Sequence, residues 1–337
     1  MRIAINGFGR IGRIFFRQAF EHKGIEIVVI NDLGDANQLA YLLKYDSVYG
    51  RYAKEVGFKN GNLIVDGKNI KFISEKEATK LPWKDLKIDV VVESTGVFES
   101  FQKAKAHIDA GAKRVVITAP AKDEESEIGR TILMGVNEHA LKTCLISSNG
   151  SCTTNSAHPV AQVLSENPGI EKAVLNTVHG YTATQSLVDG PSKGDWRRGR
   201  AAAHNIVPST TGAAISVARA VENLKGKFDG VAMRVPVIAG SMSDFTFIAK
   251  RKTSAEEIND ILRKASQDKR WQGIFKVTEE QIVSSDILGE PYGAIVDLGY
   301  TKVVDNTLVK VLSWYDNEWG YTATLVCHVL ALANYIK

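Results

Sequence analysis

The stretch Arg2-Ile3-Ala4-Ile5-Asn6-Gly7-Phe8-Gly9-Arg10-Ile11-Gly12 decides the fold of the first half of this 337-residue chain. An apolar run at residues 3–5 predicts a short buried strand, and three glycines follow it with the spacing G-x-G-x-x-G. Residues 11–20 then carry the apolar spacing of a helix. The order of strand, glycine turn and helix predicts the first unit of a parallel, dinucleotide-binding sheet.

Each glycine has a physical task in such a turn. Gly7 permits the tight turn, Gly9 lets the backbone approach a pyrophosphate, and Gly12 allows close packing of helix on strand. Taken alone, the three residues are equally well explained as an ordinary glycine turn. Asp32, which ends the next strand-like run, adds a carboxylate that can accept from ribose hydroxyls and would repel a 2′-phosphate, so the pattern favours NAD over NADP. As a single residue, Asp32 also fits a plain turn.

Two patterns divide the chain. In the first half, strand-like runs at residues 3–5, 25–30, 89–93, 114–118 and 144–147 alternate with helical spacing at 11–20, 36–45 and 101–110, which predicts an α/β, Rossmann-type, doubly wound parallel sheet. From about residue 170, longer β-rich runs at 173–178, 230–237, 245–249, 294–298 and 308–314 predict an α+β domain with a mostly antiparallel sheet. We therefore expect an NAD-binding domain at 1–150, joined by a C-terminal helix at 317–337, and a catalytic domain at 151–316.

Composition excludes several classes of protein. The formal charge of +4 is small for this length and does not indicate nucleic-acid binding. No uninterrupted apolar stretch predicts a membrane span, and the first residues lack the features of a signal peptide. Cys144, Cys152 and Cys327 are an odd number of cysteines without metal-ligand spacing, so we expect no metal site and a cytoplasmic protein.

Cys152 is the candidate nucleophile. It stands in the polar run Ser151-Cys152-Thr153-Thr154-Asn155, between a strand and a helical segment at 157–164, and a helix N-terminus stabilises a thiolate. The alternative is a buried, unreactive cysteine, which the apolar surroundings of Cys144 and Cys327 fit better. His179, at the end of a strand, is the candidate base, although the sequence alone does not place it beside Cys152. A Cys–His pair would lower the pKa of the thiol below its free value.

Longer motifs carry a family resemblance. Residues 151–155, followed by Val178-His179-Gly180-Tyr181-Thr182-Ala183-Thr184-Gln185, closely resemble the phosphorylating glyceraldehyde-3-phosphate dehydrogenase family. The segments 6–13, 43–47, 209–214 and 314–321 carry the same resemblance, which therefore covers essentially the whole chain.

The resemblance implies a function. It implies NAD-dependent oxidation of glyceraldehyde-3-phosphate to 1,3-bisphosphoglycerate, a step of glycolysis and gluconeogenesis, through a thioester on Cys152 that inorganic phosphate cleaves. His179 would be the base, and Asn317 would orient the nicotinamide amide. Because residues 181–203 resemble a loop that packs against a neighbouring subunit, the resemblance also implies a homotetramer.

The resemblance also implies binding residues. Two anion sites, for the substrate phosphate and the attacking phosphate, would be formed by hydroxyls, backbone N–H groups and guanidinium groups, which suit phosphate oxygens. These residues are Ser151, Thr153, Thr182, Arg198, Thr211, Gly212 and Arg234. The cofactor-binding residues would be Gly7, Phe8, Gly9, Arg10, Ile11, Gly12, Asp32, Leu33, Thr95, Gly96, Thr118 and Asn317. Taken singly, each threonine is a typical turn or cap residue and each arginine a typical surface charge.

Departures and alternatives remain. Gly150 and Gly180 stand where the family usually has alanine, which predicts a looser backbone around Cys152 and His179, and Ser156 stands where a second cysteine is usual. An erythrose-4-phosphate dehydrogenase shares the nucleophile and cofactor, and a catalytically silent relative that binds NAD or RNA belongs to another class. Retention of Cys152, His179 and Arg234 speaks against the silent relative.

Overall fold

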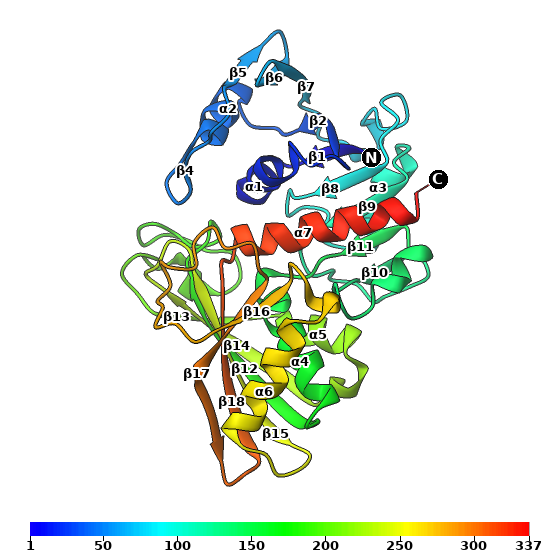
Figure 1. Cartoon of the computed structure of the whole chain (residues 1–337). Coiled ribbons are helices and arrows are strands. Elements are labelled where there is room, and N and C mark those ends of the chain that lie inside the picture. Colours follow the sequence, from blue (N-terminus) through cyan, green and yellow to red (C-terminus); the bar gives the residue numbers. More distant parts are fainter. Residues whose placement is uncertain (337) are drawn as a thin grey trace. The chain divides into compact units, whose positions relative to one another are not determined.

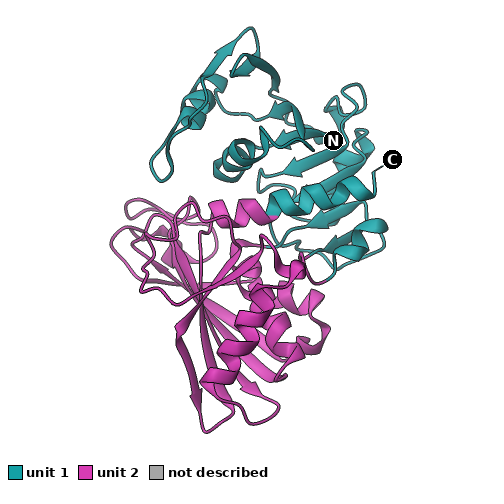
Figure 2. Ribbon diagram, viewed as in Figure 1, with its two compact units in different colours: residues 1–132, 137–150, 325–337 teal, residues 133–136, 151–324 magenta. Residues whose placement is uncertain are grey.

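The computed structural model describes residues 1–336, which form two compact units (Figures 1 and 2). The first unit comprises residues 1–132, 137–150 and 325–336, and the second comprises residues 133–136 and 151–324. Each unit contains a sheet and its own hydrophobic core. The fold class predicted from the sequence is confirmed.

The first unit contains a nine-stranded sheet in the order β10-β11-β9-β8-β1-β2-β7-β6-β5. The strands from β10 to β7 pair in parallel, which is the pattern expected of a doubly wound sheet. Their bounds are β1 (Arg2–Asn6), β2 (Glu26–Asn31), β7 (Lys68–Ile73), β8 (Val90–Glu93), β9 (Arg114–Ile117), β10 (Gly129–Thr131) and β11 (Ile146–Ser148).

An antiparallel edge, absent from the sequence-based prediction, extends this sheet. Strands β5 (Val56–Lys59) and β6 (Asn62–Val65) pair with each other, and β6 pairs with β7. The turns between them are Asn60-Gly61 and Asp66-Gly67, in which both residues have positive φ. Asn-Gly and Asp-Gly are the preferred residues of such two-residue hairpin turns, so the signal was present in the sequence. A further hairpin joins β3 (Tyr45–Asp46) and β4 (Gly50–Arg51).

Helices cover both faces of the first sheet. Ile3 and Ile5 lie in one buried cluster with Phe15 and Phe16 of α1 (Arg10–Ala19). Ala4, on the opposite face of the same strand, lies in a second cluster with Phe101 of α3 (Phe101–Asp109). Successive residues of a strand point to opposite faces, so a strand buried on both sides reads as a continuous apolar run. Helix α2 (Ala36–Lys44) follows β2.

The second unit contains a seven-stranded sheet in the order β13-β14-β12-β15-β18-β17-β16. Pairing is antiparallel except for β12 with β14 and β16 with β17. The bounds are β12 (Ile170–Gly180), β13 (Val207–Thr210), β14 (Phe228–Val235), β15 (Ser241–Ala249), β16 (Phe275–Thr278), β17 (Ala294–Val304) and β18 (Leu308–Tyr315). Strands β13 (Val-Pro-Ser-Thr) and β16 (Phe-Lys-Val-Thr) had not been predicted, because neither contains the continuous apolar run that marks the equally short β8 and β9.

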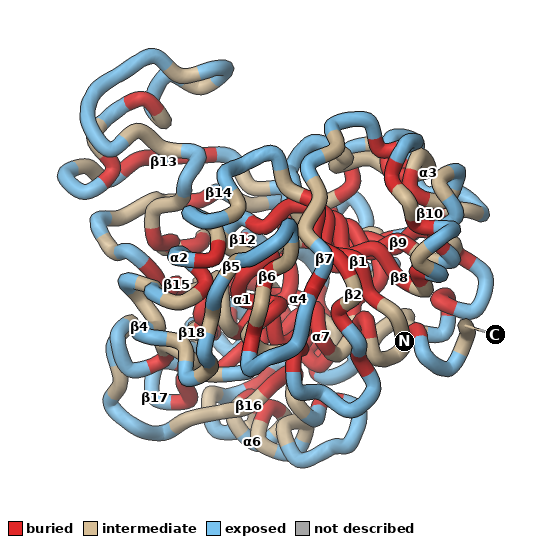
Figure 3. Tube along the Cα trace, turned by 90° about the horizontal axis from the view of Figure 1, so that it is seen from above, coloured by how far each residue is buried: buried red, intermediate tan, exposed pale blue. Residues whose placement is uncertain are grey.

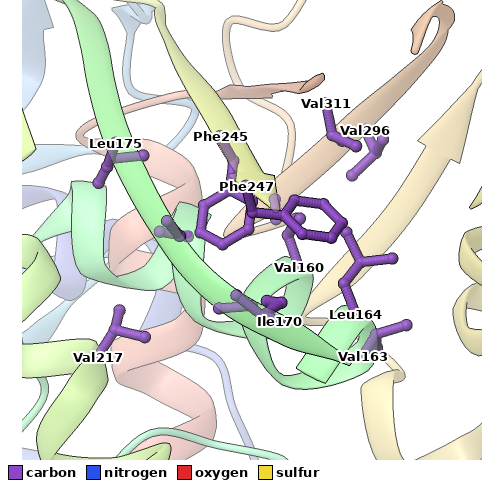
Figure 4. Packing of buried hydrophobic residues seen from close by; sticks show 14 of the residues in the cluster. Val160, Val163, Leu164, Ile170, Leu175, Val217, Phe245, Phe247, Val296 and Val311 are labelled. Atoms are coloured by element: carbon purple, nitrogen blue, oxygen red, sulfur yellow. The ribbon is translucent and has the colours of Figure 1, made fainter. Parts of the chain in front are cut away.

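One face of this sheet is packed and the other is open. Helices α4 (Cys152–Glu166), α5 (Ala213–Ala220) and α6 (Ala255–Ser266) contribute to the core, and Figure 4 shows Val160 and Leu164 of α4 close to Phe247. The opposite face exposes Val174 and Tyr300. Figure 3 shows the resulting contrast between buried central segments and exposed loops.

Helix α7 (Trp319–Ala331) begins in the second unit and continues into the first. It starts two residues later than the predicted helix, where Asp316 Oδ1 accepts from the N–H groups of Glu318 and Trp319. Short 3-10 helices complete the chain: Ala78–Lys80, Glu138–Lys142, Trp196–Gly199, Glu222–Leu224, Lys269–Trp271 and Leu332–Asn334.

Candidate active site

Cys152 is the first residue of α4, and the helix start is held by a reciprocal cap. Ser151 Oγ accepts from the N–H of Thr154 at 3.0 Å, and the N–H of Ser151 donates to Thr154 Oγ1 at 3.1 Å. This cap satisfies two of the donors that every helix leaves unpaired at its N-terminus. Cys152 therefore lies at the positive end of the helix dipole, which favours negative charge on its sulfur or on a bound oxyanion.

His179 lies beside Cys152, which the sequence alone did not establish. It stands next to the end of β12, and its Nε2 is 3.3 Å from Cys152 Sγ. Its Nδ1 is 2.6 Å from the carbonyl oxygen of Gly180. A carbonyl oxygen only accepts, so this contact suits the tautomer with its proton on Nδ1, whereas the guanidinium of Arg234, which only donates, also lies 2.6 Å from Nδ1. General base catalysis by Nε2 uses the tautomer with the proton on Nδ1, in which Nε2 can accept from the thiol.

Arg234 is brought to the same place by strand register. His179 and Arg234 are partners in the parallel pairing of β12 with β14. One guanidinium nitrogen of Arg234 contacts His179 Nδ1 at 2.6 Å and donates to the carbonyl oxygen of Gly180 at 3.2 Å. Two residues 55 positions apart in the sequence therefore share one carbonyl oxygen.

Burial governs the protonation of the Cys–His pair. Burial lowers the pKa of His179 to about 3, assisted by the positive charge of Arg234. Burial also raises the pKa of the Cys152 thiol, opposed by Arg234 and by the N–H of Thr153. This direction is opposite to the sequence-based expectation of a lowered thiol pKa, because removal of water disfavours both charged forms. The resting pair is a neutral thiol and a neutral imidazole.

A buried tyrosine supports both catalytic side chains. The hydroxyl of Tyr315 is 2.9 Å from Thr153 Oγ1 and 2.7 Å from Thr177 Oγ1. Its ring packs edge-on against the His179 imidazole, with ring centroids 5.9 Å apart. Tyr315 thereby ties the first turn of α4 to β12. Sequence reasoning missed both Tyr315 and Thr177, since no local motif connects residues on β12, β18 and α4.

Two of the predicted anion-binding residues, Arg198 and Thr182, make side-chain contacts with separate neighbours in the second unit. Arg198 donates to Ser209 Oγ through two nitrogens, at 3.2 and 2.8 Å. Its charge lowers the pKa of Arg234, an effect that is secondary to burial of Arg234. Thr182 Oγ1 is 2.9 Å from Thr184 Oγ1. Ser209 had not been predicted, although it lies in the motif at 209–214 that carried the family resemblance.

Two further predicted residues lie at the start of α5. Thr211 Oγ1 accepts from the N–H of Ala213, and the exposed Gly212 is the N-cap of the helix. Gly212 has no side chain to cap the helix, and the N–H of Ala213, the first residue of α5, donates to Thr211. The hydroxyl of Thr211 and the exposed backbone of Gly212 are groups that suit a phosphate oxygen.

The glycine turn of the first unit has the close contacts that the motif predicts. A Cβ atom on Gly7, which has φ of +95°, would lie 2.7 Å from the backbone of Ser94 and Thr95. A Cβ atom on Gly12 would lie 2.2 Å from the carbonyl oxygen of Gly7. Around Gly9, the N-cap of α1, no atom lies within 4 Å of such a Cβ. Close packing at Gly7 and Gly12 and open space at Gly9 fit a pyrophosphate approaching the backbone.

A cavity of about 400 Å³ adjoins this turn. Of the predicted cofactor residues, Gly7, Gly9, Asp32, Leu33 and Thr95 line it. Phe8, Arg10, Ile11, Gly12, Gly96 and Thr118 belong to the same unit but are not among its lining residues. Sequence reasoning missed the lining residues Asn6, Asn31, Glu75, Lys76, Ala78, Leu81, Ser94 and Val97. Several of them are neighbours of predicted residues in the sequence. The ends of β1, β2 and β8 could therefore have been used to predict them.

Asp32 uses both carboxylate oxygens. Oδ2 accepts from the N–H of Phe8 at 2.6 Å, and Oδ1 accepts from the N–H of Gly34 at 2.7 Å. The carboxylate therefore connects the end of β2 to the glycine turn. It keeps a negative charge beside the cavity, which fits an unphosphorylated ribose.

Among residues 1–336, no group of three His, Cys, Asp or Glu side chains could hold a metal ion. None of the helices in that range combines the length and the apolar character that crossing a membrane requires. All three cysteines have free thiols.

Comparison with known proteins identifies the family. Residues 1–101 match the family model of the glyceraldehyde 3-phosphate dehydrogenase NAD binding domain, and residues 151–317 match that of the C-terminal domain. Glyceraldehyde-3-phosphate dehydrogenase of Borreliella burgdorferi is 51% identical over 97% of this chain and 98% of its own length. The enzyme of Streptomyces coelicolor is 48% identical over 99% of both chains, and that of Clostridium pasteurianum is 47% identical over 96% of both. The chain belongs to the glyceraldehyde-3-phosphate dehydrogenase family.

Proposed function

We propose that this protein is an NAD-dependent, phosphorylating glyceraldehyde-3-phosphate dehydrogenase that works through a thioester on Cys152. The observation that carries the proposal is the 3.3 Å contact between Cys152 Sγ and Nε2 of His179, at the N-terminus of α4. The relatives named above favour this substrate over erythrose-4-phosphate and over a silent binding function.

The chemistry begins with proton transfer. His179 Nε2 takes the proton of the Cys152 thiol as the sulfur attacks the aldehyde carbon, which forms a thiohemiacetal. The developing oxyanion is held by the N–H of Cys152 at the start of α4 and by the protonated His179. The neutral resting pair creates its charges only during the reaction, next to the positive charge of Arg234.

Oxidation and phosphorolysis complete the cycle. NAD, when bound, supplies the two-electron acceptor. The oxyanion of the thiohemiacetal first takes the proton from His179, which frees Nε2. As the C–H bond breaks and its electron pair leaves as hydride to that acceptor, Nε2 accepts the hydroxyl proton, which leaves a thioester on Cys152. A phosphate oxygen attacks the thioester carbon, the sulfur leaves as a thiolate, and the product is the acyl phosphate 1,3-bisphosphoglycerate.

Each of two arginines is proposed to bind a different phosphate. We infer that Arg234, with Thr182, holds the substrate phosphate, since Arg234 contacts the group that activates the nucleophile. Arg198, with Ser151, Thr153, Thr211 and Gly212, would hold the attacking phosphate. Burial lowers the pKa of Arg234, the positive charge of Arg198 adds to that effect, and a bound anion would offset both.

We further propose that residues 1–150 act as the NAD-binding domain, residues 151–316 as the catalytic domain, and four copies as the cytoplasmic assembly. The support for assembly is exposed apolar surface: Leu187 and Val188 are 77% and 72% exposed, and Trp196 is 85% exposed. Apolar groups gathered on one loop typically mark an interface. Light scattering coupled to size-exclusion chromatography would show a mass near 37 kDa, the mass of one chain, if this proposal is wrong.

One experiment tests the reaction. NADH formation from glyceraldehyde-3-phosphate and NAD is measured with and without inorganic phosphate, for the unmodified protein, for Cys152→Ser and for the control Cys327→Ser. We expect phosphate-dependent turnover that Cys152→Ser abolishes and Cys327→Ser retains. A single phosphate-independent burst would place the acyl acceptor elsewhere, and the absence of NADH from protein that binds NAD would refute the proposal.

A further inference from the structure

The side-chain amide of Asn317 has a defined orientation. Its Oδ1 accepts from the N–H of Gly240 at 3.0 Å and from Ser241 Oγ at 2.9 Å. A backbone N–H only donates, so the amide atom facing Gly240 must be oxygen. Asn317 is only 5% exposed. Within residues 1–336, both of these hydrogen bonds are made by the side-chain oxygen, and the amide Nδ2 is the group that can donate to a ligand.

Ser241 joins this amide to the strand that carries the base. Its Oγ accepts from the N–H of Gly180 at 3.2 Å and donates to Asn317 Oδ1 at 2.9 Å. The carbonyl oxygen of Gly180 lies 2.6 Å from His179 Nδ1. Gly180 is therefore linked to both functional side chains. Its carbonyl oxygen contacts His179, and its N–H is linked through Ser241 to the amide of Asn317.

Tertiary packing makes this link rigid. Ser241 is the first residue of β15, is 2% exposed and pairs with Tyr315 of β18, two residues before Asn317. Gly180 packs closely enough that a Cβ there would lie 2.9 Å from the carbonyl oxygen of Val237. A hydroxyl bonded at both ends in such a place has little freedom to rotate.

We propose that Ser241 is a positioning residue that holds Asn317 with its amide N–H groups toward the nicotinamide carboxamide. In this orientation Asn317 donates to the carboxamide carbonyl oxygen, which distinguishes the carbonyl end of that group from its NH₂ end. The proposal rests on the role given above to Asn317. Ser241 acts only through Asn317 and touches neither substrate nor cofactor.

The chain contains a matched control. Ser243 lies two residues along β15, so it faces the same side of the sheet, and it is 1% exposed. Its Oγ has no hydrogen-bond partner in the described chain. Ser243→Ala removes the same atom from the same strand without breaking the link between Gly180 and Asn317. Any general effect of losing a buried hydroxyl from β15 appears in both variants.

The test measures binding and needs no turnover. Dissociation constants for NAD and for its acetylpyridine analogue, which keeps the ring carbonyl but lacks the amide NH₂, are determined by titration calorimetry. We expect Ser241→Ala to weaken both ligands equally, by about 10-fold relative to Ser243→Ala, the size of one ordinary hydrogen bond. Ser241→Cys, which keeps the volume with a weaker donor, should lie between the two and covers the case in which the alanine variant folds poorly.

Three outcomes overturn parts of the reasoning. Binding of both ligands by Ser241→Ala within twofold of Ser243→Ala would remove the positioning role. A loss confined to NAD would show that the Asn317 oxygen, and not its nitrogen, meets the carboxamide. Asn317→Ala separates the two levels: if it weakens NAD while Ser241→Ala does not, only the role of Ser241 fails. If Asn317→Ala leaves NAD binding unchanged, the proposed role of Asn317 itself fails.

Discussion

Replacing Glu93 by glutamine should weaken NAD binding, although Glu93 was not among the predicted site residues. Glu93 ends β8, and its carboxylate is buried. One oxygen accepts from the N–H and the hydroxyl of Thr95, at 2.8 and 2.5 Å. The other accepts from Asn6 at 2.5 Å and from His107 at 2.9 Å. Asn6 and Thr95 both line the cavity beside the glycine turn.

The donor on His107 is assigned by its other neighbour. The indole N–H of Trp83 lies 3.1 Å from His107 Nδ1, and an indole N–H only donates. Nδ1 is therefore the acceptor, and Nε2 carries the proton that is donated to Glu93. Each carboxylate oxygen consequently meets two donors.

Glutamine cannot reproduce this pattern. Its NH₂ group would face two donors in place of one carboxylate oxygen, which breaks two hydrogen bonds to a charged group, each worth about 1.5–3 kcal/mol. Summed, and reduced by local relaxation, the loss is about 3–5 kcal/mol. Because Asn6 and Thr95 lose their anchor, we expect NAD affinity to fall by at least about 10-fold.

The assay combines the midpoint of thermal unfolding with calorimetric titration of NAD. Glu99→Gln is the matched control, since Glu99 pairs with Lys122, whose side chain is 75% exposed, and such surface pairs contribute about 0–1 kcal/mol. Equal midpoints and equal NAD dissociation constants for the two variants would refute the reasoning. A lower midpoint with unchanged NAD affinity would confine Glu93 to a structural role.

Three further predictions follow from burial and packing. Mild peroxide should convert Cys152 to sulfenic and then sulfinic acid without forming an intrachain disulfide, because Ser156, and not a cysteine, lies one helical turn away. Mass spectrometry of the treated protein checks this, and the variant Ser156→Cys should form the disulfide. Gly180→Ala should lower stability by about 1–3 kcal/mol, because its Cβ would approach a backbone oxygen at 2.9 Å; the thermal midpoint is compared with that of Gly57→Ala, where nothing lies within 4 Å. Burial lowers the pKa of His328 to about 3, so below about pH 6.5 the unfolded chain binds a proton that the folded chain does not, and stability falls as pH falls, by about 1.4 kcal/mol per unit. Denaturation at several pH values should show that slope reduced in His328→Gln, and an unchanged slope would contradict the assignment.

The prediction for Gly180 differs from the sequence-based expectation. Glycine was expected to loosen the backbone beside His179, whereas in the structure Gly180 is buried, bonded through both backbone groups and packed against Val237. Gly150 is different, since its φ of +66° is a conformation that glycine adopts without strain and alanine does not. The two departures from alanine therefore have separate physical explanations.

The elements that could be predicted are those whose signal is local. The strands at residues 2–6 and 26–31, the helix after the glycine turn and the polar start of α4 all follow from the apolar period and from residues within one turn of each other. The β5–β6–β7 edge was missed although its Asn-Gly and Asp-Gly turns are local signals. The strands β13 and β16 lack the continuous apolar run by which β8 and β9, which are equally short, could be predicted.

The sequence by itself determined the glycine turn, the acidic residue that follows it, and a cysteine at a helix N-terminus, because each depends on neighbours along the chain. Only the tertiary structure placed His179 at 3.3 Å from Cys152 and Arg234 in register with His179. It also decided the protonation of the pair, since burial reversed the expected direction of the thiol pKa. These features depend on contacts between strands that are distant in the sequence. Strand register, burial and the hydrogen bonds of Ser241 and Glu93 therefore cannot be predicted from local sequence patterns.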